Sequence, residues 1–135
     1  MATKIFVNLP IKDLNRSVEF FTKLGYTFNA KFTNESATCM VISDTIFVML
    51  LMEKHFQNFT KKEIANAKQT TEVIIALDAA SREEVDTMVK NAVAAGGSIY
   101  REPDDYGWMY SHSFEDLDGH QWEILYMNES QMPQK

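Results

Sequence analysis

The chain carries one order of predicted elements twice, and this duplication constrains its fold more than any single motif does. The order is strand, helix, strand, strand, strand, read from the spacing of apolar residues and turn residues along the 135 positions. When the second half of the sequence is aligned with the first at an offset of 75 residues, Val48 corresponds to Glu123. At an offset of 66 residues, Phe6 corresponds to Glu72. Two copies of a βαβββ unit therefore predict an α+β fold.

The duplication also predicts how the chain is divided. We expect a single domain over residues 1–135, with a first βαβββ module at 2–53 and a second at 71–128. Residues 54–70 are polar and predict the linker, in which Thr60 and Glu63 have the spacing of a capping box for a short helix. Phe56 and Phe59 are unusual in a linker, and we expect them to pack on the body or to line the mouth of a pocket.

Each module has clear helix signals. Asp13 can cap a helix that ends before Gly25, because glycine readily adopts the left-handed conformation after a helix. Ser81 and Glu84 form a capping box for the second helix, which Gly96-Gly97 ends. The predicted strands cover residues 5–9, 26–32, 38–42, 46–52, 71–77, 98–101, 108–114 and 121–127. Residues 46–52 are all apolar, so both faces of that strand must be covered, inside a sheet or against a partner chain.

The turn at Asp118-Gly119 leads into the last strand, which contains Glu123. Alternation along a strand directs Glu123 to the same face as Leu125 and Met127, and Trp122 to the other face. A carboxylate in such a strand is costly to bury without a partner. Glu123 is therefore either a metal ligand or an acid or base in a cavity, or a half-exposed strand residue.

Composition excludes several classes of function. The net charge is −6 and no basic run interrupts it, which argues against nucleic-acid binding. Cys39 is the only cysteine, so an internal disulfide and a cysteine-based metal cluster are both excluded. The N-terminus lacks the apolar core of a signal peptide, and no apolar run reaches membrane-spanning length. These features predict a soluble cytoplasmic protein without a membrane partner.

Two motifs resemble the vicinal oxygen chelate superfamily. Residues 7–26 (VNLPIKDLNRSVEFFTKLGY) resemble its opening strand, Asp-Leu, Ser, paired aromatics and Leu-Gly-aromatic, and residues 114–123 (FEDLDGHQWE) resemble its closing Asp-Pro-Asp-Gly-x-x-x-Glu, with Leu117 in place of proline. The resemblance covers nearly the whole chain. It is closest to a bacterial branch labelled glyoxalase/bleomycin resistance/dioxygenase-like, or predicted lactoylglutathione lyase.

This resemblance implies a curled mixed sheet of two half-barrels around a cleft. In the enzymes of the superfamily, four inward His and Glu side chains hold a divalent metal that polarises neighbouring substrate oxygens. The corresponding positions here are Phe6, Val48 or less readily Met49, Glu72 and Glu123, and only Glu123 keeps the expected carboxylate. The resemblance thus implies either no metal or an atypical divalent ion (Ni, Zn, Fe or Mn) with Glu123 as its ligand.

Glu123 and Glu72 are the candidate catalytic residues, as proton-transfer groups within one cavity. An exposed Glu72 at the start of a strand is an equal alternative. The candidate ligand-binding residues are apolar or aromatic side chains and one histidine, which alternatively pack in the core: Phe6, Phe47, Val48, Trp108, Tyr110 and His112.

Three functions follow. The first is a metal-free protein of the bleomycin-resistance type, a homodimer whose clefts bind a small organic ligand. The second is a metal-dependent enzyme that uses Glu123, a glyoxalase like lactoylglutathione lyase or an extradiol dioxygenase. The third is a structural or regulatory dimer without cleft chemistry. The superfamily hosts many activities, so the fold alone does not choose among them.

Overall fold

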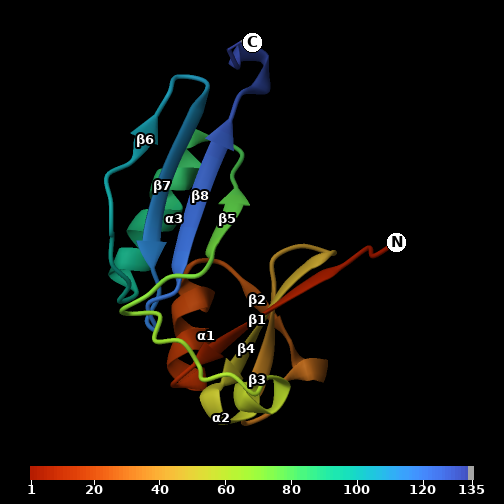
Figure 1. Cartoon of the computed structure of the whole chain (residues 1–135). Coiled ribbons are helices and arrows are strands. Elements are labelled where there is room, and N and C mark those ends of the chain that lie inside the picture. Colours follow the sequence, from red (N-terminus) through yellow and green to blue (C-terminus); the bar gives the residue numbers. More distant parts are fainter. Residues whose placement is uncertain (134–135) are drawn as a thin grey trace. The chain divides into compact units, whose positions relative to one another are not determined.

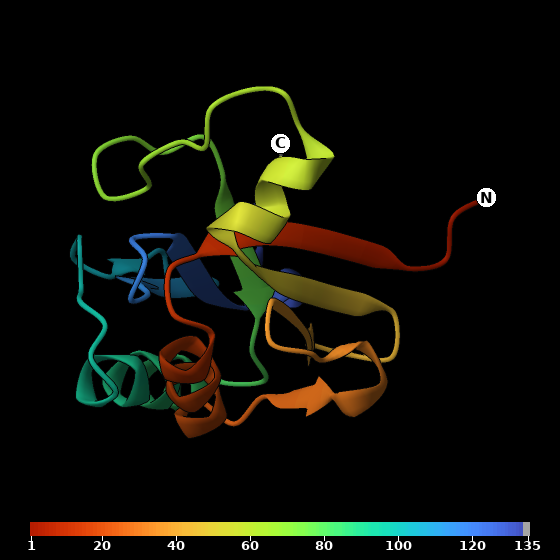
Figure 2. The ribbon, with the colours of Figure 1, turned by 90° about the horizontal axis from the view of Figure 1, so that it is seen from below.

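The computed structural model describes residues 1–133 and contains two compact units, Met1–Ala65 and Asn66–Lys135. Each unit is a βαβββ module with one four-stranded mixed sheet (Figures 1 and 2). The α+β fold and its internal duplication are therefore confirmed. The boundary between the units falls within residues 54–70, the segment expected to be the linker. None of the described helices is long and apolar enough to cross a membrane.

The first module places its last strand beside its first. The strand order is β1-β4-β3-β2, in which β1 and β4 are parallel and the other pairs are antiparallel. The elements are β1 (Ile5–Ile11), α1 (Leu14–Lys23), β2 (Thr27–Asn29), η1 (Ala30–Phe32), β3 (Ala37–Val41), β4 (Ile46–Met52), α2 (Glu53–Phe56) and η2 (Gln57–Phe59). The wholly apolar strand β4 lies between β1 and β3, which confirms that it is inside the sheet.

The second module repeats this topology. Its strand order is β5-β8-β7-β6, and β5 is again parallel to the last strand. The elements are β5 (Ile74–Asp78), α3 (Arg82–Ala94), β6 (Asp104–Asp105), β7 (Met109–Glu115), β8 (Gln121–Met127) and η3 (Glu129–Gln131). Strand β8 has the predicted bounds, and Trp122 and Ile124 are buried while Glu123 is half-buried. The predicted alternation of faces is therefore confirmed.

A helix covers one face of each sheet and leaves the other face for a site. In the first module, the buried sheet residues on the helix side occupy alternate positions along their strands: Leu9, Ile11, Met40, Val48 and Leu50. Phe20 and Phe21 of α1 are buried as well. In the second module they are Phe114, Trp122 and Ile124, with Val85, Val89 and Ala92 of α3. Burial of these large side chains is the main stabilising term of each module.

The predicted helix caps are present. The Asp13 side chain accepts a hydrogen bond from the Arg16 backbone N–H, and Gly25 after the helix has φ 101°. The Ser81 hydroxyl accepts from the Glu84 N–H, and the Glu84 carboxylate accepts in return from the N–H of Ala80. Both helices therefore begin and end where local chemistry predicts.

Three predicted elements are wrong in part. Residues 26–32 form a strand only at Thr27–Asn29, because the Asn29 side chain accepts from the Lys31 N–H and starts a 3-10 turn. Residues 98–101 form only an isolated bridge between Ser98 and Glu115. The Thr60 hydroxyl accepts from the Lys62 N–H, two residues on, so a tight turn replaces the expected helix.

The buried Asp116 carboxylate organises the closing turn. It accepts hydrogen bonds from the backbone N–H groups of Asp118 (2.9 Å) and His120 (3.0 Å), and from the Trp122 indole N–H (2.9 Å). Gly119 has φ 89°, and a Cβ there would lie 2.8 Å from the backbone nitrogen of Lys68. The turn therefore requires glycine for its conformation and for close backbone approach.

A second polar network connects β6 and β7 to α3. The Arg82 guanidinium donates two hydrogen bonds of 2.8 Å to Asp105, and its Cζ lies 5.1 Å from the ring centroid of Tyr110. Hydrogen bonds from Arg82 and from the Gly107 N–H lower the pKa of Asp105 to about 2. The Tyr110 hydroxyl donates to Asp86 at 2.5 Å, and this bond is the main cause that raises the pKa of Tyr110 to about 12.

We expect the substitution Asp116→Ala to lower the free energy of unfolding by about 3 kcal/mol, because it leaves three donors of one buried turn without an acceptor. Chemical denaturation followed by Trp fluorescence measures this change. Asp44→Ala, at an exposed turn, is the control and should change stability by less than about 0.5 kcal/mol. Equal stabilities of the two variants would contradict the role of Asp116.

Tyrosine titration tests the second network. The pKa of one tyrosine should be about 12 in the wild type and should be lowered towards the ordinary value of 10.0 in Asp86→Asn, which removes the charged acceptor. Because the folded state retains this proton, the stabilisation from Tyr110 is complete below pH 10.0 and is lost as the pH rises towards about 12. Ultraviolet absorbance of ionised tyrosine measures the transition, and an unchanged titration in Asp86→Asn would refute the assignment.

Candidate functional site

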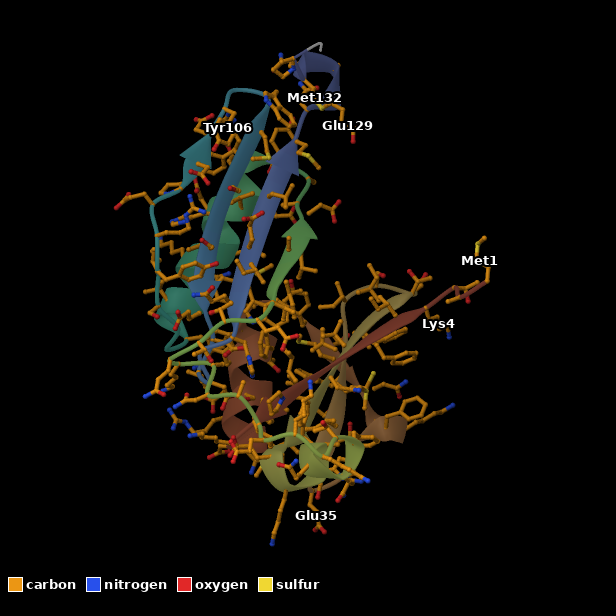
Figure 3. All side chains as sticks on the ribbon, viewed as in Figure 1. Met1, Lys4, Glu35, Tyr106, Glu129 and Met132 are labelled. Carbon is orange, nitrogen blue, oxygen red and sulfur yellow. The ribbon has the colours of Figure 1, made fainter. Side chains whose placement is uncertain are left out.

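The face of the first sheet opposite α1 is called here the open face of the first module. Cross-strand pairs place Phe6 beside Phe47 and Asn8 beside Met49 on this face. The Phe6 and Phe47 rings stack with centroids 4.9 Å apart, and the Lys4 ammonium (labelled in Figure 3) lies 5.8 Å from the Phe47 centroid. Phe6 is nevertheless half exposed, at 52%. Large apolar side chains therefore reach solvent on this face.

A cavity of about 360 Å³ lies further along the open face. Its residues come from the sheet, from the turn η1 and from the helical segment α2–η2: Asn8, Lys31, Phe32, Thr33, Asn34, Ala37, Met49, Leu51, His55 and Phe59. Because all of these residues belong to Met1–Ala65, one module forms the whole cavity. We refer to it as the first-module cavity.

Local hydrogen bonds hold the η1 side of this cavity. The Thr33 hydroxyl donates to the Asn29 carbonyl at 2.8 Å and contacts the Thr38 hydroxyl at 2.8 Å. The Asn34 side-chain oxygen accepts from the Ser36 N–H, so the side-chain amide of Asn34 keeps its donor group for other partners. This side of the cavity is therefore built by short-range contacts that precede β3.

The α2–η2 side of the cavity is aromatic. The His55 and Phe59 rings meet edge to face with centroids 5.4 Å apart, and Phe59 is 65% exposed. Phe59 thus lines the cavity, as one of the two alternatives from the sequence predicts, whereas Phe56 is not among the lining residues.

Charge is distributed unevenly in the first-module cavity. Lys31 and His55 can carry positive charge, and none of the lining residues is acidic. None of the ion pairs found within residues 1–133 includes Lys31 or His55. The cavity therefore presents the Lys31 ammonium and the His55 imidazole without a carboxylate in its lining, in a chain whose net charge is −6.

Val48 does not lie on the open face. It is 1% exposed on the helix side of β4, and the next residue, Met49, lines the cavity instead. The alignment of the two modules at an offset of 75 residues therefore matches Val48 with Glu123 although their side chains lie on opposite faces. An error of one residue in such an alignment is enough, because successive side chains of a strand point to opposite faces. Met49 is the residue that matches Glu123 in face.

Glu123 and Glu72 are not neighbours on the second sheet. Glu123 lies on the face opposite α3, where its cross-strand partners are Ala76 and Ser113. Glu72 is exposed in a bend before β5 begins at Ile74, four residues before Ala76. Four extended residues span about 13 Å, so the register does not bring these carboxylates together as an acid–base pair.

The remaining predicted residues lie on or near the helix side. Tyr110 bonds to Asp86 of α3, and His112 pairs with the buried Ile124 on that same face. The Nδ1 atom of His112 is buried and has no hydrogen-bond partner. Within residues 1–133 it is the one buried side-chain nitrogen or oxygen atom that lacks a partner. Trp108 precedes β7, and its carbonyl accepts from the Asn128 N–H at 2.7 Å. The predicted set is therefore divided between two faces and two modules.

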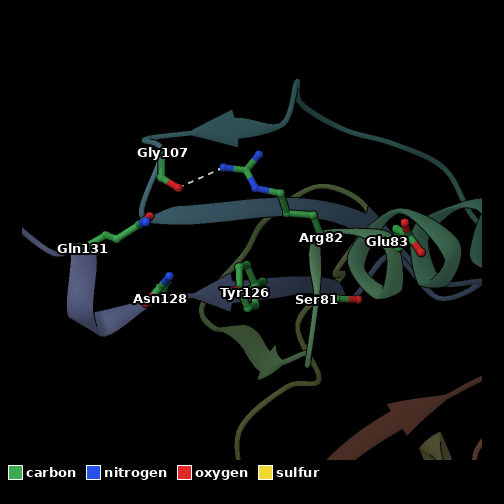
Figure 4. A pocket seen from close by; sticks show the side chains of 7 residues that line it. All are labelled: Ser81, Arg82, Glu83, Gly107, Tyr126, Asn128 and Gln131. Atoms are coloured by element: carbon green, nitrogen blue, oxygen red, sulfur yellow. Dashed lines mark hydrogen bonds between the residues drawn. The ribbon is translucent and has the colours of Figure 1, made fainter.

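A second cavity, of about 340 Å³, lies at the start of α3 (Figure 4). It is lined by Ser81, Arg82, Glu83, Gly107, Tyr126, Asn128 and Gln131. The Arg82 guanidinium donates to the Gly107 carbonyl at 3.0 Å and to Asp105, so its donors already have protein acceptors. This cavity therefore offers no unpaired cation to a ligand.

Sequence reasoning missed most of the first-module cavity. Lys31 and Phe32 fall in a predicted strand, Asn34 falls between two predicted strands, and Asn8 falls in a strand whose face was unknown. The available signal was the Asn29 side chain, since asparagine favours a local turn that would move Lys31 and Phe32 out of the sheet. The pairing of Asn8 with Met49 had no signal in the sequence.

The donors on the open faces do not fit the four-ligand metal site that the resemblance implies. Phe6 and Met49 supply no carboxylate or imidazole, and Glu123 has Ala76 and Ser113 as its cross-strand neighbours. Within residues 1–133, no three His, Cys, Asp or Glu side chains come together. One carboxylate alone makes a weak, mostly hydrated site.

Comparison with known proteins identifies relatives of this architecture. The bleomycin resistance protein-like N-terminal family matches residues 3–43. The hypothetical protein SA1046 from S. aureus is 32% identical, with a TM-score of 0.79 over 93% of this chain and 94% of that one. A glyoxalase/bleomycin resistance protein/dioxygenase from Nocardioides is 26% identical, with a TM-score of 0.73 over 100% of this chain and 89% of that one. A comparison with curated protein sequences gave no match.

A glyoxalase-related enzyme from Fulvimarina pelagi shares the fold, with a TM-score of 0.79 and 21% identity over 93% of this chain and 88% of that one. The repeated βαβββ topology, the opening and closing motifs and these similarities agree with one another. The chain therefore has the fold of the glyoxalase/bleomycin resistance protein/dioxygenase proteins, is a relative of SA1046 over nearly its whole length, and matches the bleomycin resistance protein-like family in its N-terminal part.

Proposed function

We propose that this protein binds a small organic ligand in the first-module cavity and does not use a metal ion to do so. The observation that carries the proposal is the cavity of about 360 Å³ on the open face, with an apolar floor and a few polar groups. Cavities of this size and composition suit small organic ligands, which are oriented by a small number of hydrogen-bonding groups.

The side chains of the cavity favour binding over chemistry on the ligand. Met49 and Leu51 on β4 are apolar, and Met49 stands at the position that matches Glu123. The substitution of thioether and phenyl groups for metal ligands removes the Lewis acid on which superfamily enzymes depend. Binding without conversion, as the bleomycin-resistance resemblance implies, requires only the cavity.

The proposal includes a homodimer and a cytoplasmic location. The homodimer comes from the superfamily resemblance, and the cytoplasmic location comes from the single cysteine. A metal-dependent lyase or dioxygenase that uses Glu123 is the alternative function. Metal analysis and ligand binding separate the two.

Elemental analysis of protein purified without chelator should give far less than one Ni, Zn, Fe or Mn per chain after dialysis. Glu123→Gln should leave this metal content unchanged, because a single carboxylate holds a hydrated ion weakly. Stoichiometric metal in the wild type that is lost in Glu123→Gln would instead establish the metal-dependent alternative.

A neutral aromatic probe, 2-naphthamide, should bind the wild type with a saturable heat signal in calorimetry. Phe59→Ala should weaken this binding roughly threefold to tenfold, since one aromatic contact is lost. Phe59 is 65% exposed, so the variant should unfold at the same temperature as the wild type. Tyr106→Ala, at a 61% exposed aromatic of the second module, is the matched control and should bind normally. Unsaturable binding, or an equal loss in both variants, would refute the proposed site.

A further inference from the structure

We infer that the ligand of the first-module cavity is an organic anion with a flat aromatic body. This inference rests on the proposed function and adds the chemical class of the ligand. It depends on three features of the lining residues: two exposed aromatic rings, two basic side chains (Lys31 and His55) without acidic partners, and amide groups with free donor capacity.

The aromatic rings indicate a flat apolar body. Phe32 on η1 and Phe59 on η2 are 59% and 65% exposed, so much of each ring is free to contact a ligand. Met49 and Leu51 lie on the sheet between these two turns as lining residues of the same cavity. A planar ring against Met49 would cover apolar surface of Met49, Phe32 and Phe59, while the buried Leu51 lies beneath it.

The charges indicate an anionic group. Lys31 lies beside Phe32 on one side of the lining, and His55 meets Phe59 on the other. Neither has an acidic partner within residues 1–133, and no acidic residue lines the cavity. An anion would therefore gain attraction without displacing an existing ion pair, whereas a cation would be repelled.

The amide groups complete the recognition of an anion. The Asn34 side-chain oxygen accepts a hydrogen bond from the Ser36 N–H at 2.8 Å. The group that Asn34 can still offer to a ligand is therefore its NH₂ donor. Asn8 is exposed on the open face beside Met49. Amide donors that line the same cavity as a cation suit a carboxylate, because charge-assisted hydrogen bonds to an anion are stronger than neutral ones.

The second cavity, by contrast, contains a cation that is already paired with protein acceptors. Arg82 there donates to both oxygens of Asp105 and to the Gly107 carbonyl, and Glu83 adds a negative charge to the lining. An anion would have to compete with Asp105 for this guanidinium. The selectivity for anions is therefore assigned to the first-module cavity.

Three probes of one shape test the inference, namely 2-naphthoate, the neutral 2-naphthamide and the cationic 2-naphthylmethylammonium. Calorimetry on the full chain should show naphthoate binding about tenfold tighter than naphthamide, and the cation binding more weakly than both. Lys31→Gln should remove the preference for naphthoate, so that naphthoate and naphthamide bind this variant with similar affinities. Lys90→Gln, an exposed lysine of α3, makes the same charge change elsewhere and should retain the preference.

Two failures are distinguishable. Saturable binding of naphthamide without a preference for naphthoate, or with a preference for the cation, would overturn the anionic ligand and leave the proposed binding function intact. A preference that survives both Lys31→Gln and His55→Gln would also overturn the assignment. Absence of saturable binding by all three probes would overturn the binding function and this inference together.

Discussion

Side-chain alternation along the last strand of each module is the constraint on which the rest of the structure depends. Strands β4 and β8 each pair with a strand on either side. The face that a side chain of β4 or β8 takes, towards the helix or away from it, is therefore shared by its cross-strand partners. Val48 and Trp122 are buried on the helix side, and Met49 and Glu123 therefore belong to the opposite faces. A register change of one residue would exchange these roles and bury a carboxylate under α3.

The two modules share a topology and differ in the chemistry of their open faces. The first module offers a cavity with Met49, Lys31 and two exposed aromatic rings. The second carries Glu123 on its open face, and its cavity lies instead at the start of α3, where Arg82 is bound to Asp105. The duplicated backbone thus gives two sheets of one topology, and the individual side chains make their open faces chemically different.

Features governed by local chemistry were predicted well. Asp13 and Ser81 cap their helices, and the strands Ile46–Met52 and Gln121–Met127 have the expected bounds. Capping and turn signals act over three or four residues, so a sequence contains all of the partners that matter. The errors at residues 26–32 and 60–63 arose where a side chain, Asn29 or Thr60, bonds to the backbone two residues on and competes with regular structure.

The sequence by itself determined the repeated βαβββ order, the helix caps and the face that Glu123 shares with Leu125, because these follow from local periodicity and short-range hydrogen bonds. Only the tertiary structure decided that Met49 replaces Val48 on the open face, that His112 and Tyr110 lie towards α3, and that Lys31, Phe32 and His55 line one cavity. The physical reason is that pairing between strands and the cover of each face depend on residues far apart in the chain, and no local pattern records which of them meet.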